Sequence, residues 1–176
     1  MILCLGGGAC AGVRAGRGWP EHLWEQLHGS QVVANAGAPG ARLVDVVRLL
    51  PTWPGPVPAV VVLQVGTEDA RGGGMPPSEF CGLLQQAVDT ARSLWPCAVL
   101  VVCTAPPLVP TSVSGYNRAA RRWLRRVEPL VIALAASNGV LLAGLGSMPE
   151  ELLADGVHPS REGARWIAAL VAAVIP

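Results

Sequence analysis

Residues 59–69 read AVVVLQVGTED, an apolar run that ends abruptly in a glycine and polar residues. A short run rich in valine and leucine is typical of a strand that is buried on both faces of a parallel sheet. Ligands of such sheets bind beyond the carboxyl ends of the strands. We therefore expect the GTED segment (residues 66–69) to lie at a functional edge of the molecule.

Similar runs recur along the chain and alternate with segments of helical periodicity. The other predicted strands are residues 2–5, 31–35, 97–103 and 139–143. Apolar residues repeat with a helical period over residues 43–50, 80–91 and 164–174, and Ser160 is a candidate N-cap of the last segment. This alternation predicts one α/β domain over residues 1–176, flavodoxin-like, with three α/β/α layers and a five-stranded parallel sheet ordered 2-1-3-4-5.

The composition excludes several classes of protein. The formal net charge is +1, which argues against nucleic acid as a partner. No apolar run approaches the ~20 residues of a membrane span, and the opening MILCLGGG is too short for a signal peptide. We expect a soluble, cytoplasmic protein without membrane contact. Five cysteines without a CxxC pair and three scattered histidines predict no metal site, and we expect no cofactor.

Four segments rich in glycine and polar residues flank the predicted strands. They are GGGACAG (residues 6–12), NAGAPG (35–40), GTED (66–69) and DGVHPS (155–160). In a parallel sheet with this strand order, all four meet at one edge.

Together these segments resemble the sequence blocks of the SGNH, or GDSL-type, hydrolase family. LCLGGGACAG is similar to the first block, in which Gly-Asp-Ser follows the first strand, and NAGAPG to the second, whose glycine donates a backbone N–H. VGTEDAR is similar to the third block, Gly-x-Asn-Asp, and DGVHPS to the fifth, which supplies the catalytic Asp and His. The resemblance runs the length of the chain, implies the SGNH-hydrolase type of fold, and assigns catalytic roles to Asp155 and His158.

Three positions depart from the family pattern. Counted from Gly6, the family's serine falls on Gly8 and the aspartate before it on Gly7, while the third-block asparagine falls on Glu68. Ester hydrolysis in this family needs a hydroxyl nucleophile and donors aimed at the oxyanion. Glycine offers no hydroxyl, and an ionised Glu68 offers a negative charge in place of a donor. The departures predict a hydrolase fold without the usual serine chemistry.

The groups that remain suit non-covalent acid/base catalysis. His158, oriented by Asp155, can still move a proton, and Glu68 can act as the opposing acid or base. Two such groups facing one cavity suit cyclisation, isomerisation, elimination, or water or epoxide addition. Gly7 and Gly8 are predicted to widen the pocket and to present bare N–H groups at a helix N-terminus, where a substrate carbonyl or carboxylate can bind.

Further residues are candidates with a plain structural alternative beside each. Asn35, Gly37 and Asp69 are predicted to contact substrate, although Asn35 and Gly37 can serve only their turn and Asp69 can hold its loop by accepting backbone N–H bonds. Cys10 is a weaker candidate nucleophile. A helix N-terminus lowers a thiol pKa, but two residues of helix turn the side chain by about 200° away from the serine position.

Three other functions stay open. The first is a GDSL-type ester or acyl hydrolase with a displaced nucleophile or direct attack by water. The second is a non-catalytic binding pseudoenzyme. The third is a dinucleotide-binding protein, because Gly6-x-Gly8-x-x-Ala11 fits the G-x-G-x-x-G/A pattern, although no acidic residue ends the second predicted strand.

The loops suggest a substrate class. Residues 70–77 and 105–115 are rich in glycine, proline and small apolar residues, so they are predicted to wall a modest apolar pocket. We expect a small, mostly apolar metabolite as partner, and a homo-oligomer is compatible with the sequence. The Arg-only basic set and abundant Ala, Gly, Val and Pro suggest a GC-rich bacterial genome, and hence a role in specialised metabolism.

Overall fold

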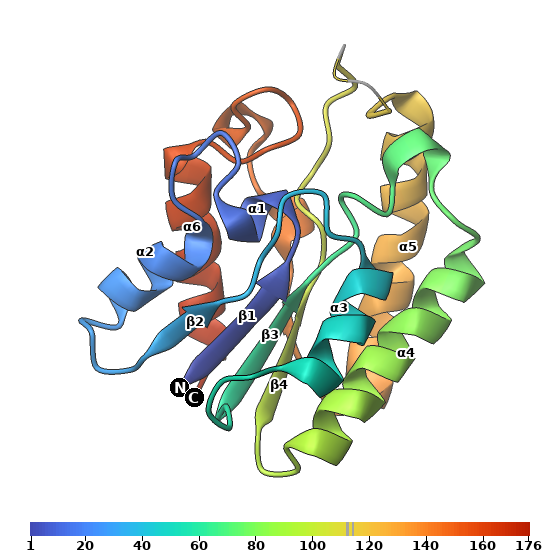
Figure 1. The fold of residues 1–176 in the computed structure, drawn as a ribbon. Helices are drawn as coiled ribbons and strands as arrows, with labels where there is room; N and C mark the ends of the chain where they lie inside the picture. Colours follow the sequence, from blue (N-terminus) through green and yellow to red (C-terminus); the bar gives the residue numbers. More distant parts are fainter. Residues whose placement is uncertain (112, 114) are drawn as a thin grey trace.

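A five-stranded parallel sheet forms the centre of the computed structural model, which describes residues 1–111, 113 and 115–176 (Figure 1). The strands are β1 (Ile2–Gly6), β2 (Val33–Asn35), β3 (Val60–Gln64), β4 (Val99–Cys103) and β5 (Leu141–Ala143). Their order is β2-β1-β3-β4-β5, and each neighbouring pair is parallel. The predicted order and three-layer architecture are therefore confirmed.

Helices cover both faces of the sheet (Figure 1). One face carries α3 (Leu43–Leu49), α4 (Pro77–Leu94) and α5 (Arg118–Ser137), and the other carries α2 (Trp19–Gln26) and α6 (Arg161–Val174). The shorter elements are α1 (Gly8–Ala11), η1 (Leu50–Thr52), η2 (Arg71–Gly73), η3 (Leu145–Ser147) and η4 (Glu150–Leu152). Among the described residues, no helix combines the length and the apolar character needed to cross a membrane.

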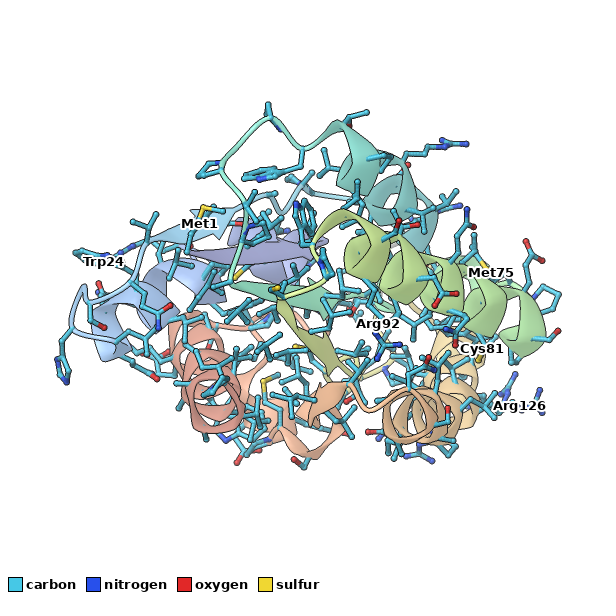
Figure 2. All side chains as sticks on the ribbon, turned by 90° about the horizontal axis from the view of Figure 1, so that it is seen from below. Met1, Trp24, Met75, Cys81, Arg92 and Arg126 are labelled. Atoms are coloured by element: carbon cyan, nitrogen blue, oxygen red, sulfur yellow. The ribbon has the colours of Figure 1, made fainter. Side chains whose placement is uncertain are left out.

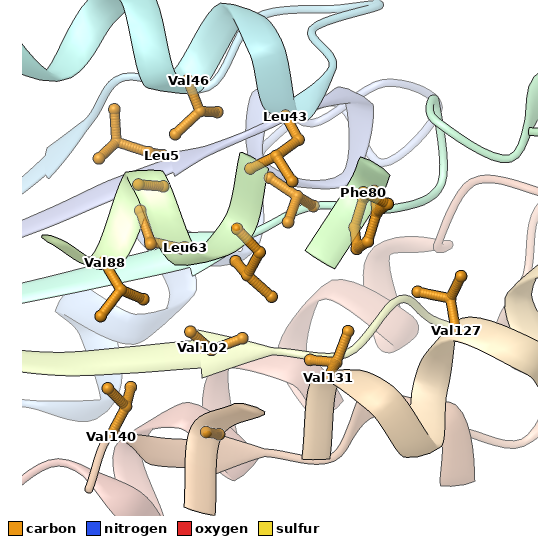
Figure 3. Packing of buried hydrophobic residues seen from close by; sticks show 14 of the residues in the cluster. Leu5, Leu43, Val46, Leu63, Phe80, Val88, Val102, Val127, Val131 and Val140 are labelled. Atoms are coloured by element: carbon orange, nitrogen blue, oxygen red, sulfur yellow. The ribbon is translucent and has the colours of Figure 1, made fainter. Parts of the chain in front are cut away.

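Alternate residues of the strands pack into two separate hydrophobic cores, one on each face of the sheet. Leu5, Leu63 and Val102 pack with residues of α3, α4 and α5, as Figure 3 shows, whereas Cys4, Val62 and Val101 pack with residues of α2 and α6. The central strands β1 and β3 are buried along their whole length. This double burial explains why their sequences are almost continuously apolar.

Both outer strands are shorter than predicted. β2 and β5 each comprise three residues, where the apolar pattern suggested five. An outer strand has one neighbour only, and Val32, just before β2, is 67% exposed. Exposure also extends to α2, where Trp24 lies at the periphery (Figure 2) and is 48% exposed. Because apolar residues also occur outside the core, an apolar run in the sequence can extend beyond the strand that it predicts.

The predicted start of the last helix is confirmed. The Ser160 side chain accepts a hydrogen bond from the backbone N–H of Gly163 at 3.2 Å, which makes it the N-cap of α6. The loop that ends at Ser160 carries Asp155 and His158. The cap therefore fixes where this loop joins the helix.

Candidate functional site

Asp155 and His158 form a hydrogen-bonded pair in the loop before α6. The His158 Nδ1 lies 3.0 Å from Asp155 Oδ2, and Asp155 Oδ1 accepts the backbone N–H groups of Val157 at 3.1 Å and His158 at 2.9 Å. Arg14 Nε also donates to Oδ2 at 3.2 Å. Because Nδ1 donates to the carboxylate, the lone pair of the imidazole resides on Nε2.

The same contacts set the charge of Asp155. Partial burial alone raises the pKa of this carboxyl, but the hydrogen bonds from the His158 backbone and ring and from the Val157 backbone outweigh it and lower the pKa to about 2. Asp155 is thus a carboxylate at any pH near neutrality. It stabilises the imidazolium that forms when His158 takes up a proton.

A short antiparallel contact closes the loop at its base. Leu153 and Pro159 form an isolated bridge, the Ala154 N–H donates to the His158 carbonyl at 2.7 Å, and the Ser160 N–H donates to the Leu152 carbonyl at 2.7 Å. These bonds hold the His158 backbone in place. Position and tautomer of the imidazole are both fixed by the protein.

Position 8 lies directly against the free side of this imidazole. A Cβ atom at Gly8 would lie 3.3 Å from His158 Nε2 and 3.2 Å from its Cδ2. A hydroxyl one bond further out would be within hydrogen-bonding reach of Nε2. The geometry supports the alignment of Gly8 with the family's serine, and the residue present there is glycine.

Glu68 lies on the other side of the glycine pair and faces inward. Its Cγ is 3.3 Å from the Cβ position of Gly7, and only 8% of the residue is exposed. Glu68 is therefore a largely buried side chain and does not point to solvent. The carboxylate borders the same small space as Gly7 and Gly8.

Tyr116, which the sequence analysis missed, joins Glu68 to His158. Its ring meets the His158 ring edge-on, with centroids 6.5 Å apart and an interplanar angle of 72°, and the Arg71 guanidinium lies over the Tyr116 ring at 5.8 Å. Burial raises the pKa of Tyr116, and Glu68, as a hydrogen-bond acceptor and a negative charge, raises it further. The phenol is therefore protonated at neutral pH and donates toward Glu68.

Three residues predicted to contact substrate are engaged within the protein instead. Asp69 accepts the backbone N–H groups of Leu43 at 3.0 Å and Gly66 at 3.1 Å, so it holds its loop, as its structural alternative proposed. Asn35 donates to the Cys10 carbonyl and to Glu21, and its Oδ1 accepts the Gly37 N–H at 2.9 Å. The Asp69 carboxylate, the Asn35 amide and the Gly37 N–H therefore all have hydrogen-bond partners within the protein.

Cys10 is placed in the core and not in the site. The residue is fully buried, and a Cβ at Gly37 would lie 2.8 Å from its sulfur. Burial raises the pKa of the Cys10 thiol well above its ordinary value, and the nearby Cys103 and Glu21 raise it further. The expected lowering of the thiol pKa by a helix N-terminus is wrong, and burial and the raised pKa both disfavour Cys10 as a nucleophile.

The helix that should supply that N-terminus is a single turn. α1 ends at Ala11, because Gly12 adopts a left-handed conformation (φ 78°) and its N–H returns to the Gly8 carbonyl. A four-residue helix has little macrodipole. The N–H groups of Gly7 and Gly8, where an anion site was predicted, therefore lack the electrostatic field of a longer helix N-terminus.

Two cavities lie beside these residues. One of about 10 Å³ is lined by Gly7, Gly8, Ala9, Ala41, Gln64, Val65, Gly66, Thr67 and Glu68. The other, of about 180 Å³, lies between the loop after β4 and α5 and shares Val65 and Gly66 with the first. Within the described part of the chain, no group of three or more His, Cys, Asp or Glu residues could hold a metal ion.

The loops contribute unequally to the larger cavity. Ala105, Pro106, Pro107 and Leu108 line it, in agreement with the predicted apolar wall. Residues 70–77, which were predicted to form another wall, pack instead on α5, where the Trp123 indole donates to the Met75 carbonyl. Of the predicted loop 105–115, residues 112 and 114 lie outside the described residues.

Comparisons with known proteins agree with this arrangement. A sequence profile of the GDSL-like lipase/acylhydrolase family matches residues 4–166. The chain belongs to this family. A search of curated proteins finds no match.

Solved structures of GDSL-type esterases share the fold. A member of the lipolytic G-D-S-L family from Veillonella parvula superimposes with a TM-score of 0.80 at 19% identity, covering 99% of this chain and 97% of the other. A carbohydrate acetylesterase from Sinorhizobium meliloti gives 0.81 at 17% identity (98% and 96% covered), and the M. smegmatis aryl esterase gives 0.79 at 18% (98% and 96%).

Proposed function

We propose that this GDSL-family protein is an enzyme that transfers protons without forming a covalent intermediate. The observation that carries the proposal is the contact between His158 Nε2 and position 8, where the family's nucleophile would stand and this chain has glycine. The His158–Asp155 pair retains its hydrogen bonds. The site keeps its base, and the glycine at position 8 offers that base no side-chain hydroxyl to activate.

In the proposed reaction His158 takes a proton from the substrate or from a water molecule at position 8. The imidazolium, stabilised by Asp155, then returns the proton to the leaving atom or to a neighbouring one. Glu68, which accepts from the protonated Tyr116, serves as the second proton-transfer group. Cyclisation, isomerisation, elimination, and the addition of water or opening of an epoxide all need this pairing of an acid with a base.

The larger cavity supports a small, mostly apolar substrate. Phe80, Leu108 and Leu124 contribute to its lining, and an ion pair between Arg121 and Glu150 at 2.6 Å forms part of its wall. A volume of about 180 Å³ is small for a ligand site and limits the substrate to a small molecule. A role in bacterial specialised metabolism fits such a substrate and remains part of the proposal.

The test uses small esters, epoxides and carbonyl compounds in deuterated buffer, followed by NMR of the compounds and intact mass of the protein. We expect turnover or deuterium uptake that His158→Ala abolishes, while the protein mass stays unchanged. A fluorophosphonate should also leave wild-type protein unlabelled. A covalent adduct that depends on His158 would establish a displaced nucleophile, and the absence of any His158-dependent reaction would establish a binding protein; either result overturns the proposal.

A further inference from the structure

The cavity of about 10 Å³ beside Gly7 and Gly8 has room for one group the size of a water molecule and is bordered by hydrogen-bond acceptors. Glu68 supplies a largely buried carboxylate, and the family resemblance places an amide donor at that position. Two further lining residues, Gln64 and Thr67, each have a buried oxygen without a hydrogen-bond partner, Gln64 Oε1 and Thr67 Oγ1. Gln64 itself is only 2% exposed. Buried polar atoms without a partner are rare, because each costs free energy.

Some of the N–H donors near the cavity are engaged within the protein. The Gly66 N–H donates to Asp69, and the Gly37 N–H donates to Asn35. The Tyr116 hydroxyl faces Glu68 from the far side, and the Arg71 guanidinium is stacked on the Tyr116 ring. An incoming anion would meet the Glu68 carboxylate, whereas a cation would be attracted to it.

We infer that this cavity binds a protonated amine, and that the substrate of the enzyme carries a primary ammonium group. An ammonium has three N–H donors on a compact charge, which matches a carboxylate and two neutral oxygens. The cavity is smaller than a typical ligand site, so it suits one functional group and not a whole molecule. The polarity of the pocket is then the reverse of the family's oxyanion hole.

This inference rests on the proposed function, because only that function gives the bound amine a role in a reaction. A nitrogen held beside Glu68 would place the neighbouring carbon atoms near position 8 and within reach of His158. The apolar remainder of such a substrate would extend toward the larger cavity, which shares Val65 and Gly66 with the smaller one. Binding itself requires no proton transfer and can be measured separately.

The experiment compares three probes of equal size, propylammonium, propionate and 1-propanol, together with tetramethylammonium, a cation without N–H donors. Binding is followed through the backbone amide NMR signals of Gly7, Gly8, Gly66 and Thr67. We expect saturable shifts with propylammonium and none with the other three. Glu68→Gln, which retains an acceptor for Tyr116, should weaken propylammonium binding by roughly tenfold or more, because a charge-assisted hydrogen bond is lost.

Two controls separate this inference from the proposed function. Glu128→Gln removes a carboxylate from the lining of the larger cavity and should leave propylammonium binding unchanged. His158→Ala should also retain binding, so that amine binding with no His158-dependent chemistry would defeat the proposed function alone. Binding of propionate, no binding of propylammonium, or binding unaffected by Glu68→Gln would each overturn the inference.

Discussion

The two halves of the site differ in what they retain of the family pattern. The loop before α6 has the Asp155–His158 pair with a complete set of hydrogen bonds. The loops after β1 and β3 have glycine at position 8 and a buried Glu68 where the family has serine and asparagine. Under the proposed function, this difference means that proton transfer and covalent catalysis are separable parts of this fold, because different loops supply them.

The largest expected effect comes from restoring the changed half. Gly8→Ser with Glu68→Asn should turn an unreactive protein into one that a fluorophosphonate labels stoichiometrically on the new hydroxyl at position 8. The added Cβ fits only if His158 moves by a few tenths of an ångström, since their contact would be 3.2 Å. Intact mass and peptide mapping measure the label.

Gly8→Ala with Glu68→Asn is the matched control, because it adds the same Cβ without a hydroxyl. It should remain unlabelled. If the serine variant folds normally but also stays unlabelled, then restoring the family's residues does not restore covalent chemistry, and the proposed division of roles between the two halves is wrong.

The next effect tests the retained half. Adding His158→Ala to the serine variant should slow its labelling by roughly 10²–10⁴-fold, the range of general-base catalysis. Quenched time courses read by mass spectrometry give the rates. Equal rates with and without His158 would mean that the pair before α6 is not a working base.

A third prediction sharpens the contrast between neighbours in the loop after β3. Asp69→Ala leaves the N–H groups of Leu43 and Gly66 without their acceptor, and should lower the free energy of unfolding by about 2–4 kcal/mol. Glu68→Gln should change it far less. Chemical denaturation measures both; equal losses would show that Glu68 also holds the fold together.

The smallest expected effect is a loss of folding stability at acidic pH. The pKa of Asp155 is lowered to about 2 from an ordinary value of 3.8, so this carboxylate stabilises the fold above about pH 4, and that contribution is lost as the pH falls toward 2. The stability advantage of wild type over Asp155→Asn should therefore shrink between pH 5 and pH 3. Denaturation curves at the two pH values measure it, and a constant difference would contradict the assignment.

Local sequence patterns predicted the sheet order and the place of the chemistry. Buried parallel strands have continuous apolar sequences, and the strand order brings the ends of β1 and β3 together with the loop before α6. Membership of the GDSL family followed from motifs that sit at those ends.

What the sequence could not supply depends on contacts between distant segments. Tyr116 reaches His158 from a proline-rich loop that has no periodicity, and only its place just before Asn117, the N-cap of α5, marks it as lying at the same edge. Cys10 is buried against Gly37, far along the chain, which has no side chain and lets the two loops pack closely. Neither contact leaves a pattern in its own stretch of sequence.

The isolated bridge between Leu153 and Pro159, which closes the loop that carries His158, affects the free energy of substrate binding. Because this small ring is closed during folding, the conformational entropy of the His158 backbone is lost before any ligand arrives. The imidazole does not have to be ordered again in each turnover. The amide hydrogens of Ala154 and Ser160, whose bonds close the ring, should accordingly exchange with solvent much more slowly than those of ordinary surface loops.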